Sequence, residues 1–155
     1  MLNQFLSWAE NHHWHITIRT DNANLPAEIT SRYSVPPEWL GFIENFTCCS
    51  NSADTKWFLI FEDFSADSAF RWNEFELQSL ESADSDTDLK NQITSYWNKH
   101  LPIILCVDGE YAYYAIDTDN RNIVFGCEPE YEDPVLIADN LEQFLQKIIA
   151  GEIIL

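Results

Sequence analysis

Apolar residues recur at the spacing of an amphipathic helix in four segments of the chain. The stripes are Phe5, Trp8 and Ala9 within 4–11; Trp39, Phe42, Ile43 and Phe46 after Pro37; Leu89, Ile93, Tyr96 and Trp97 within 88–99; and Leu141, Phe144, Leu145, Ile148 and Ile149 near the end of the chain. We expect Asn140 and Gln143 to cap the last helix and Gly151 to end it. A further short helix is expected to open at 25–29, because Pro26 would lie in its first turn, where a missing N–H is tolerated.

Other segments carry the patterns of strands and loops. Residues 14–19 alternate between apolar and polar, and residues 57–61 are nearly all apolar, which predicts a central strand. Residues 70–77 are predicted to form a further strand, because Phe70 and other apolar residues would share its faces. Residues 79–88 are mostly polar or acidic and are expected to form a solvated loop.

The second half of the chain contains a hairpin signal. Residues 103–107 and 110–117 flank Asp108-Gly109, a pair typical of a type I′ turn, and 123–126 returns the chain as a third antiparallel strand. Strands joined by hairpins, with helices before and after them, predict an α+β fold. We expect an antiparallel or mixed sheet with helices packed mainly on one face.

Length and charge narrow the classes of protein. The chain has 155 residues, 46% of them hydrophobic, which suits a single domain over 1–155 with one core. Eight Lys and Arg against 26 Asp and Glu give a formal charge of −18, which argues against nucleic acid as a partner. No apolar run approaches the length of a membrane span, and the first residues carry no targeting signature, so we expect a cytoplasmic protein without membrane contact.

The motif search predicts no metal, no cofactor and no catalytic residue. Asp84, Asp86 and Asp88 have the spacing that begins a calcium loop, but Leu89 replaces the required Gly and Ser95 the required carboxylate. Three histidines lie too close in sequence to converge on zinc: His12, His13 and His15. Phosphate-binding, dinucleotide-binding and nucleophile-elbow motifs are also absent from the sequence.

The cysteines leave one enzymatic alternative open. Cys106 and Cys127 lie in apolar runs, where a thiol acts as a small core residue. Cys48 and Cys49 are adjacent, and no C-x-x-C pair is present. A small hydrolase that pairs Cys48 or Cys49 with His100 is the remaining enzymatic hypothesis.

Acidic residues concentrate in two segments. Residues 62–88 hold nine acids and one Arg, and residues 117–133 hold six acids and one Arg. Charge of this kind can serve solubility alone. It can also form a recognition surface in which carboxylates steer a basic partner and aromatic rings provide buried area.

The recognition hypothesis names two patches of candidate partner-binding residues. The first patch is Glu128, Glu130, Tyr131, Glu132 and Asp133, and the second is Trp72 and Glu74, with Phe70 as a further aromatic anchor. The expected partner is a basic protein.

Several segments together resemble the SUKH superfamily, which includes the fungal Smi/Knr-type regulators and many bacterial immunity proteins. The segments are Val35-Pro36-Pro37-Glu38-Trp39 with Phe42, Ile43 and Phe46; Asn51 followed by Trp57-Phe58-Leu59; Ile104-Leu105-Cys106-Val107-Asp108-Gly109-Glu110-Tyr111-Ala112-Tyr113-Tyr114-Ala115-Ile116-Asp117; and Val135-Leu136-Ile137-Ala138-Asp139-Asn140-Leu141-Glu142-Gln143-Phe144-Leu145. The resemblance runs from about residue 25 to about residue 150.

The resemblance implies an α+β SUKH fold and a non-enzymatic immunity protein. Such a protein binds and neutralises a cognate toxin domain, often a nuclease or deaminase, and needs no catalytic residue or cofactor. The alternative within the same family is a regulatory or scaffolding protein of the cell-wall-regulator type that binds host partners. The sequence leaves open whether the chain is a monomer or a homodimer.

Overall fold

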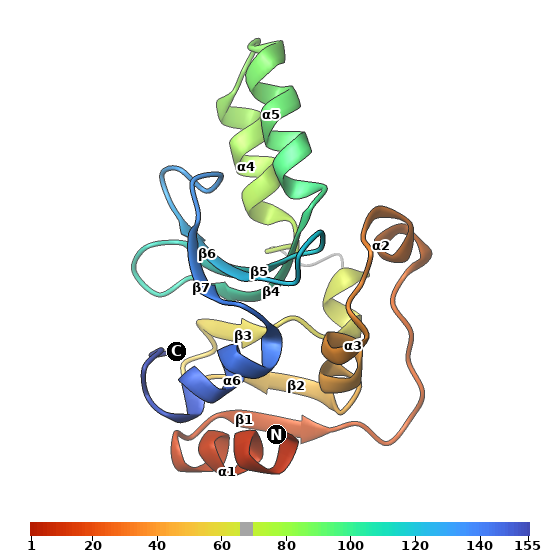
Figure 1. Cartoon of the computed structure of the whole chain (residues 1–155), viewed down its shortest axis with the longest axis vertical. Coiled ribbons are helices and arrows are strands. Elements are labelled where there is room, and N and C mark those ends of the chain that lie inside the picture. Colours follow the sequence, from red (N-terminus) through yellow and green to blue (C-terminus); the bar gives the residue numbers. More distant parts are fainter. Residues whose placement is uncertain (66–69) are drawn as a thin grey trace.

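A computed structural model describes residues 1–65 and 70–155 (Figure 1). Its helices are α1 (Leu2–Asn11), α2 (Ala27–Arg32), α3 (Pro37–Ile43), α4 (Glu74–Ser82), α5 (Thr87–Trp97) and α6 (Leu141–Ile149), with a 3₁₀ turn η1 (Phe61–Phe64). Its strands are β1 (His15–Ile18), β2 (Phe46–Ser50), β3 (Lys56–Phe58), β4 (His100–Cys106), β5 (Ala112–Asp117), β6 (Ile123–Cys127) and β7 (Val135–Ala138). Asp67, one of the acids counted in the sequence, lies outside the described residues.

The described strands form one antiparallel sheet of seven strands in the order of the chain, β1 to β7. Every neighbouring pair is antiparallel, which confirms the α+β class and the predicted meander of β4, β5 and β6. The strand predicted at 57–61 is shorter than expected, because β3 ends at Phe58. The longest pairing joins β4 to β5, at the centre of the sheet.

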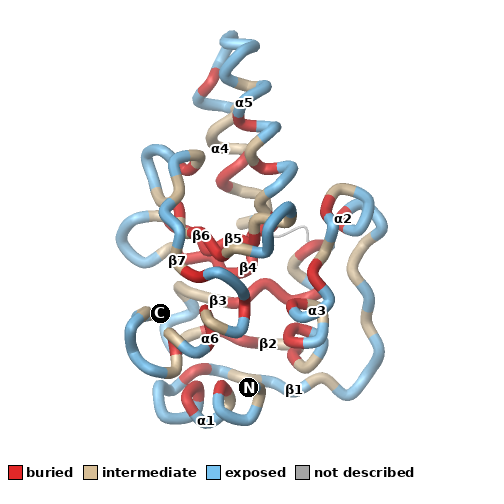
Figure 2. Tube along the Cα trace, viewed as in Figure 1, coloured by how far each residue is buried: buried red, intermediate tan, exposed pale blue. Residues whose placement is uncertain are grey.

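Helices cover both faces of the central strands, which corrects the expectation of helices mainly on one face. Adjacent strand residues point to opposite faces. Tyr114 packs on Phe144 of α6, with ring centroids 5.1 Å apart, whereas its neighbour Tyr113 packs on Trp97 of α5 at 4.8 Å. In Figure 2 the central strands are accordingly coloured as buried.

The α1 and α3 helices pack on the same face as α6. Phe58 is in register with Ile104 and, through it, with Tyr114, so these side chains share a face. Phe58 contacts Phe5 of α1 at 5.3 Å and Phe42 of α3 at 5.6 Å between ring centroids. Aromatic contacts of this kind hold the layer together by area and by edge-to-face geometry.

The helix predicted through Phe46 is shorter than its apolar stripe. α3 ends at Ile43, and Phe46 begins β2. Phe46 is fully buried, as the apolar stripe predicts. It faces the core from the start of a strand and not from a further turn of the helix. The pattern therefore located a buried residue correctly and assigned it to the wrong element.

The strand predicted at 70–77 is wrong, and the loop predicted at 79–88 is confirmed only at 83–86, between two helices. Glu74–Ser82 is the α4 helix, and Asp86 caps α5 by accepting a hydrogen bond from Leu89 N at 2.9 Å. α4 has a weak apolar stripe because one of its buried residues is Glu76, whose carboxylate pairs with Arg32 at 2.7 Å. A hydropathy pattern treats Glu76 as an exposed position, so the sequence of α4 does not show the spacing of an amphipathic helix.

The hairpin between β4 and β5 is confirmed, but its turn differs from the type I′ prediction. Five residues, 107–111, separate Cys106 from Ala112. A type I′ turn needs positive φ at both central residues. Gly109 has φ 82°, whereas Asp108 is not among the described residues with positive φ.

The ends of α6 agree with the sequence prediction. The Asn140 side chain accepts a hydrogen bond from Gln143 N at 2.9 Å. Gly151 has φ 76°, and the N–H groups of Gly151 and Glu152 donate to the carbonyls of Ile148 and Lys147. This double hydrogen bond is the Schellman ending that Gly allows at no steric cost.

Asp63 in η1 makes stability depend on pH. Its carboxylate accepts a hydrogen bond from Ile60 N at 2.8 Å, and burial raises its pKa from 3.8 to about 6. The folded chain then binds more protons than the unfolded chain between these values, so this group lowers stability as pH rises from about 4 to about 6.

Asp63→Asn should therefore become more stable relative to the native chain as pH rises. At about 1.4 kcal/mol per pKa unit, the relative gain between pH 4 and pH 7 is about 2 kcal/mol. Urea denaturation of both chains at each pH measures it. Glu62, whose pKa the hydrogen bond to Arg19 lowers, is present in both chains. A difference that stays constant with pH would contradict this reading of Asp63.

Candidate partner-binding groove

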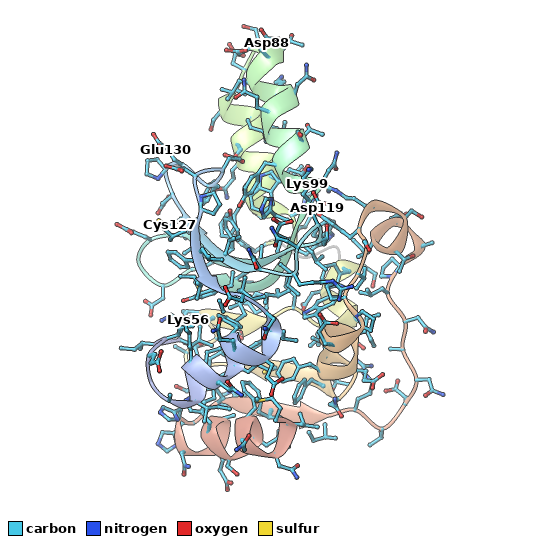
Figure 3. The ribbon with its side chains drawn as sticks, viewed as in Figure 1. Lys56, Asp88, Lys99, Asp119, Cys127 and Glu130 are labelled. Atoms are coloured by element: carbon cyan, nitrogen blue, oxygen red, sulfur yellow. The ribbon has the colours of Figure 1, made fainter. Side chains whose placement is uncertain are left out.

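A groove of about 520 Å³ lies between the α4–α5 helical hairpin and the loop 128–133. We call it the acidic groove. Its lining residues are Gln78, Ser79, Ser82, Ala83, Leu89, Ile93, Glu128, Pro129, Glu130, Tyr131, Glu132 and Asp133. Figure 3 labels Glu130 on this loop and Asp88 at the far end of the hairpin.

The helical hairpin forms one wall of the acidic groove and projects from the sheet (Figure 1). Ala83 is buried between its helices, and Asp84, with φ 45°, reverses the chain. The Asp86 cap then starts α5 in the direction that places Leu89 and Ile93 on the groove side. Leu89 is 42% exposed, so the wall offers apolar area that the chain leaves uncovered.

The loop 128–133 forms the other wall and is anchored in the core by Tyr131. The Tyr131 ring stacks on Phe75 with centroids 4.7 Å apart, and its hydroxyl donates to Gln78 Oε1 at 3.1 Å. The Tyr113 hydroxyl donates to the Tyr131 carbonyl, and Tyr96 contacts the Tyr113 hydroxyl in turn. Burial raises the pKa of Tyr131 to about 12, so its hydroxyl keeps its proton and remains a donor at neutral pH.

A second anchor joins the same loop to α5. Trp97 Nε1 donates to Glu132 Oε1 at 2.6 Å, a charge-assisted bond of the stronger kind. Trp97 is 1% exposed, so the indole position is fixed by the core. The carboxylate of Glu132 is therefore held in one orientation at the groove wall before any partner arrives.

The structure places the predicted residues of the first patch together, but it changes the role of Tyr131. Glu128, Glu130 and Asp133 are exposed and Glu132 is half-buried, all on the groove wall. Tyr131 is only 5% exposed, because its ring packs on Phe75. It therefore shapes the groove from below and does not project as the aromatic anchor that the sequence predicted.

The second predicted patch lies outside the acidic groove. The Trp72 ring packs on Phe64, with ring centroids 5.5 Å apart. The Arg32 guanidinium lies 5.7 Å from the centroid of the Trp72 ring. Glu74 lies 3.6 Å from Arg71. Phe70 packs on Phe75 and other rings and is not a free anchor. These residues support the helices and carry no part of the groove.

The groove carboxylates form no ion pair within 4.0 Å among residues 1–65 and 70–155. Five of the basic side chains form ion pairs, all with acids outside the groove: Arg19, Arg32, Arg71, Lys99 and Arg121. Lys147 donates to the Ile137 carbonyl at 2.7 Å. Glu132 accepts a hydrogen bond from Trp97 and Glu128 accepts one from Tyr111 N at 3.0 Å, but none of the four groove carboxylates is ion-paired in this part of the chain.

Several residues that line the groove are not among the predicted site residues. Ser79 lies in the predicted loop 79–88 and Gln78 lies between that loop and the predicted strand 70–77, whereas both belong to the α4 helix. Leu89 and Ile93 belonged to a correctly predicted helix stripe, but the sequence offered no means of telling a groove wall from a core contact.

The geometry gives no support to the cysteine hypothesis. Burial raises the pKa of Cys49, which disfavours the thiolate that a nucleophile needs. Cys48 Sγ contacts the His15 carbonyl and Ser50, and His100 Nδ1 contacts the Tyr96 carbonyl. Within the described part of the chain, no hydrogen bond joins either thiol to His100.

Trp97→Phe should loosen the loop 128–133, because it removes the donor to Glu132 while keeping an aromatic ring. We expect a loss of about 1–2 kcal/mol in the free energy of unfolding. Amide exchange in the loop should be about tenfold faster by mass spectrometry or NMR. Glu132→Gln is the matched control, since its carbonyl still accepts from the indole. Equal exchange in the native chain and in Trp97→Phe would show that this bond does not hold the loop.

Comparison with protein-family models, curated proteins and solved structures found no match to this chain. The described residues contain no group of three His, Cys, Asp or Glu arranged to hold a metal ion. They also contain no helix with the length and apolarity needed to span a membrane.

Proposed function

We propose that this chain is a non-enzymatic binding protein whose acidic groove takes up a basic surface of a protein partner. The observation that carries the proposal is the set of four groove carboxylates that form no ion pair in the described chain. They lie beside the exposed apolar side chain of Leu89. Carboxylates beside apolar area suit Lys and Arg, whose aliphatic stems and charged heads need both.

Charge supports the choice of partner. The net charge of −18 repels nucleic acid and acidic proteins and attracts basic ones over the screening length of about 8 Å at physiological salt. Electrostatic attraction of this kind raises the association rate, whereas the apolar contacts and the oriented Glu132 slow dissociation. The anchored loop reduces the entropy that binding would otherwise cost.

We further propose that the partner is a bacterial toxin domain, a nuclease or a deaminase, which this chain neutralises. The support is the resemblance to SUKH immunity proteins, together with an α+β fold compatible with that assignment. An enzyme that acts on nucleic acid needs a cationic surface for phosphates. A protein that presents unpaired carboxylates can cover such a surface without any chemistry of its own.

Co-expression with the products of the flanking genes tests the proposal. We expect one neighbouring gene product to inhibit growth when it is expressed alone. Expression of this chain should restore growth, and the two proteins should purify as a stable complex. If the chain is folded but binds no neighbouring gene product and restores no growth, the toxin proposal is refuted. That result would favour a regulatory role with host partners.

A further inference from the structure

The last strand of the sheet continues the acidic groove along the chain. Asp133 at the groove wall is followed by Pro134 and then by β7. β7 has a neighbour on one side only, because β6 precedes it and it ends the strand order. An edge strand carries N–H and C=O groups that a further strand can pair with.

The side chains at the start of β7 are uncovered. Val135 is 59% exposed and Leu136 is 60% exposed, although neighbouring strand residues point to opposite faces of the sheet. Both faces of this end of β7 therefore carry apolar area beside an unpaired edge. At the other end, Lys147 already covers the Ile137 carbonyl, and Ile137 has no register partner in β6. Addition of a strand is thus confined to the Val135–Leu136 end, next to the acidic groove.

We infer that β7 is a strand-addition site for an extended basic segment of the partner, which continues from the acidic groove along Val135 and Leu136. This inference rests on the proposed function and names the form of the segment that the groove receives. In such β-augmentation the main chain supplies hydrogen bonds, and alternate side chains supply specificity.

Charge selects this occupant over a second copy of the chain. β7 is flanked by Glu132 and Asp133 on one side and by Asp139 and Glu142 on the other. Antiparallel pairing of two copies through Val135 and Leu136 would bring Glu132 of each toward Asp139 of its partner, in molecules that each carry −18. A segment with Lys or Arg at alternate positions meets the same carboxylates with opposite charge.

The opposite edge of the sheet lacks these features. β1 is the other strand with a single neighbour, and its Ile18 is 51% exposed. The acids beside this edge, Asp21 and Glu62, form ion pairs with Arg19, so they attract a basic segment less than the acids beside β7 do. β1 therefore provides a matched control for edge position and apolar exposure, with neighbouring acids that are already paired.

Two synthetic twelve-residue peptides test the inference. One alternates Lys and Val, and the other alternates Lys and Pro, so both carry the same charge. In the second peptide the Pro rings fix φ at about −65° and remove every second N–H, which disfavours an extended β-strand. At about 50 mM salt, calorimetry should show the Lys-Val peptide binding at least about tenfold more tightly. Amide exchange in Val135–Ala138 should slow only with the Lys-Val peptide.

Substitutions at the two edges complete the test. Leu136→Lys should weaken binding of the Lys-Val peptide about tenfold, whereas Ile18→Lys, which adds the same charge to β1, should change it less than about twofold. Equal affinity for the two peptides, protection of β1 in place of β7, or equal effects of the two substitutions would overturn the inference. Sedimentation that shows a dimer broken by Leu136→Lys would assign the edge to a second copy and overturn it as well.

The outcomes separate this inference from the proposed function. If the Lys-Pro peptide binds, and its binding is lost when Glu130 and Asp133 are changed to Lys, the acidic groove is supported even if strand addition at β7 is refuted. If neither peptide binds, both the strand-addition site and the charge argument for the groove fail.

Discussion

Gly126→Ala is expected to destabilise the fold by about 3 kcal/mol, which lowers the melting temperature by roughly 10 °C. Gly126 in β6 is in register with Tyr113 in β5, so their substituents share a face of the sheet. A Cβ at this position would lie 2.5 Å from Cε1 and Cζ of the Tyr113 ring. Tyr113 is fully buried and its hydroxyl bonds the Tyr131 carbonyl, so the ring cannot move without disturbing the loop 128–133.

Gly41→Ala is the matched control for this substitution. Gly41 lies in α3, and a Cβ added there meets no atom within 4 Å. The same change should stabilise the chain by about 0.5–1 kcal/mol, because Ala favours the helix. Differential scanning calorimetry of both variants measures the contrast. Equal melting temperatures for Gly126→Ala and the native chain would mean that Tyr113 does not occupy the space above Gly126.

Reversal of Glu130 and Asp133 to Lys is expected to weaken binding of the co-expressed partner by at least about 100-fold, or about 3 kcal/mol. Both side chains are exposed on the groove wall and carry no ion pair among the described residues, so their reversal leaves the fold intact. The dependence of affinity on salt should also become shallower, since two attractive charges become repulsive.

Glu10 and Glu44, reversed to Lys, provide the control for net charge. Both are exposed and lie outside the acidic groove, so this pair changes the charge of the chain by the same amount. Binding of the partner should weaken less than about fivefold. Similar losses in the two double variants, measured by calorimetry over a range of salt, would show that only the overall charge matters.

Residue-level prediction succeeded where one physical effect dominated. The β4–β5 hairpin and the α6 helix follow from apolar periodicity and from cap residues that act over three or four positions, as Asn140 does for Gln143. The concentration of acids in 128–133 was also visible, because the count of charges needs no structure.

Prediction failed where distant residues decide the local structure. α4 was mistaken for a strand because Glu76 is buried by an ion pair with Arg32, which lies 44 positions earlier in the chain. The sequence predicts Tyr131 as an exposed anchor, whereas its stacking on Phe75, a residue far away in the sequence, buries it. The groove itself exists only once the helical hairpin and the loop are placed beside each other, which no local pattern encodes.

Growth rescue tests the central claim most directly. Cells that express the inhibitory neighbour would receive the native chain, the Glu130 and Asp133 double reversal, or the Glu10 and Glu44 double reversal, at matched levels of folded protein. Neutralisation through the acidic groove predicts rescue by the native chain and by the Glu10 and Glu44 reversal. It predicts loss of rescue with the Glu130 and Asp133 reversal. Full rescue by the Glu130 and Asp133 reversal would contradict neutralisation through the acidic groove.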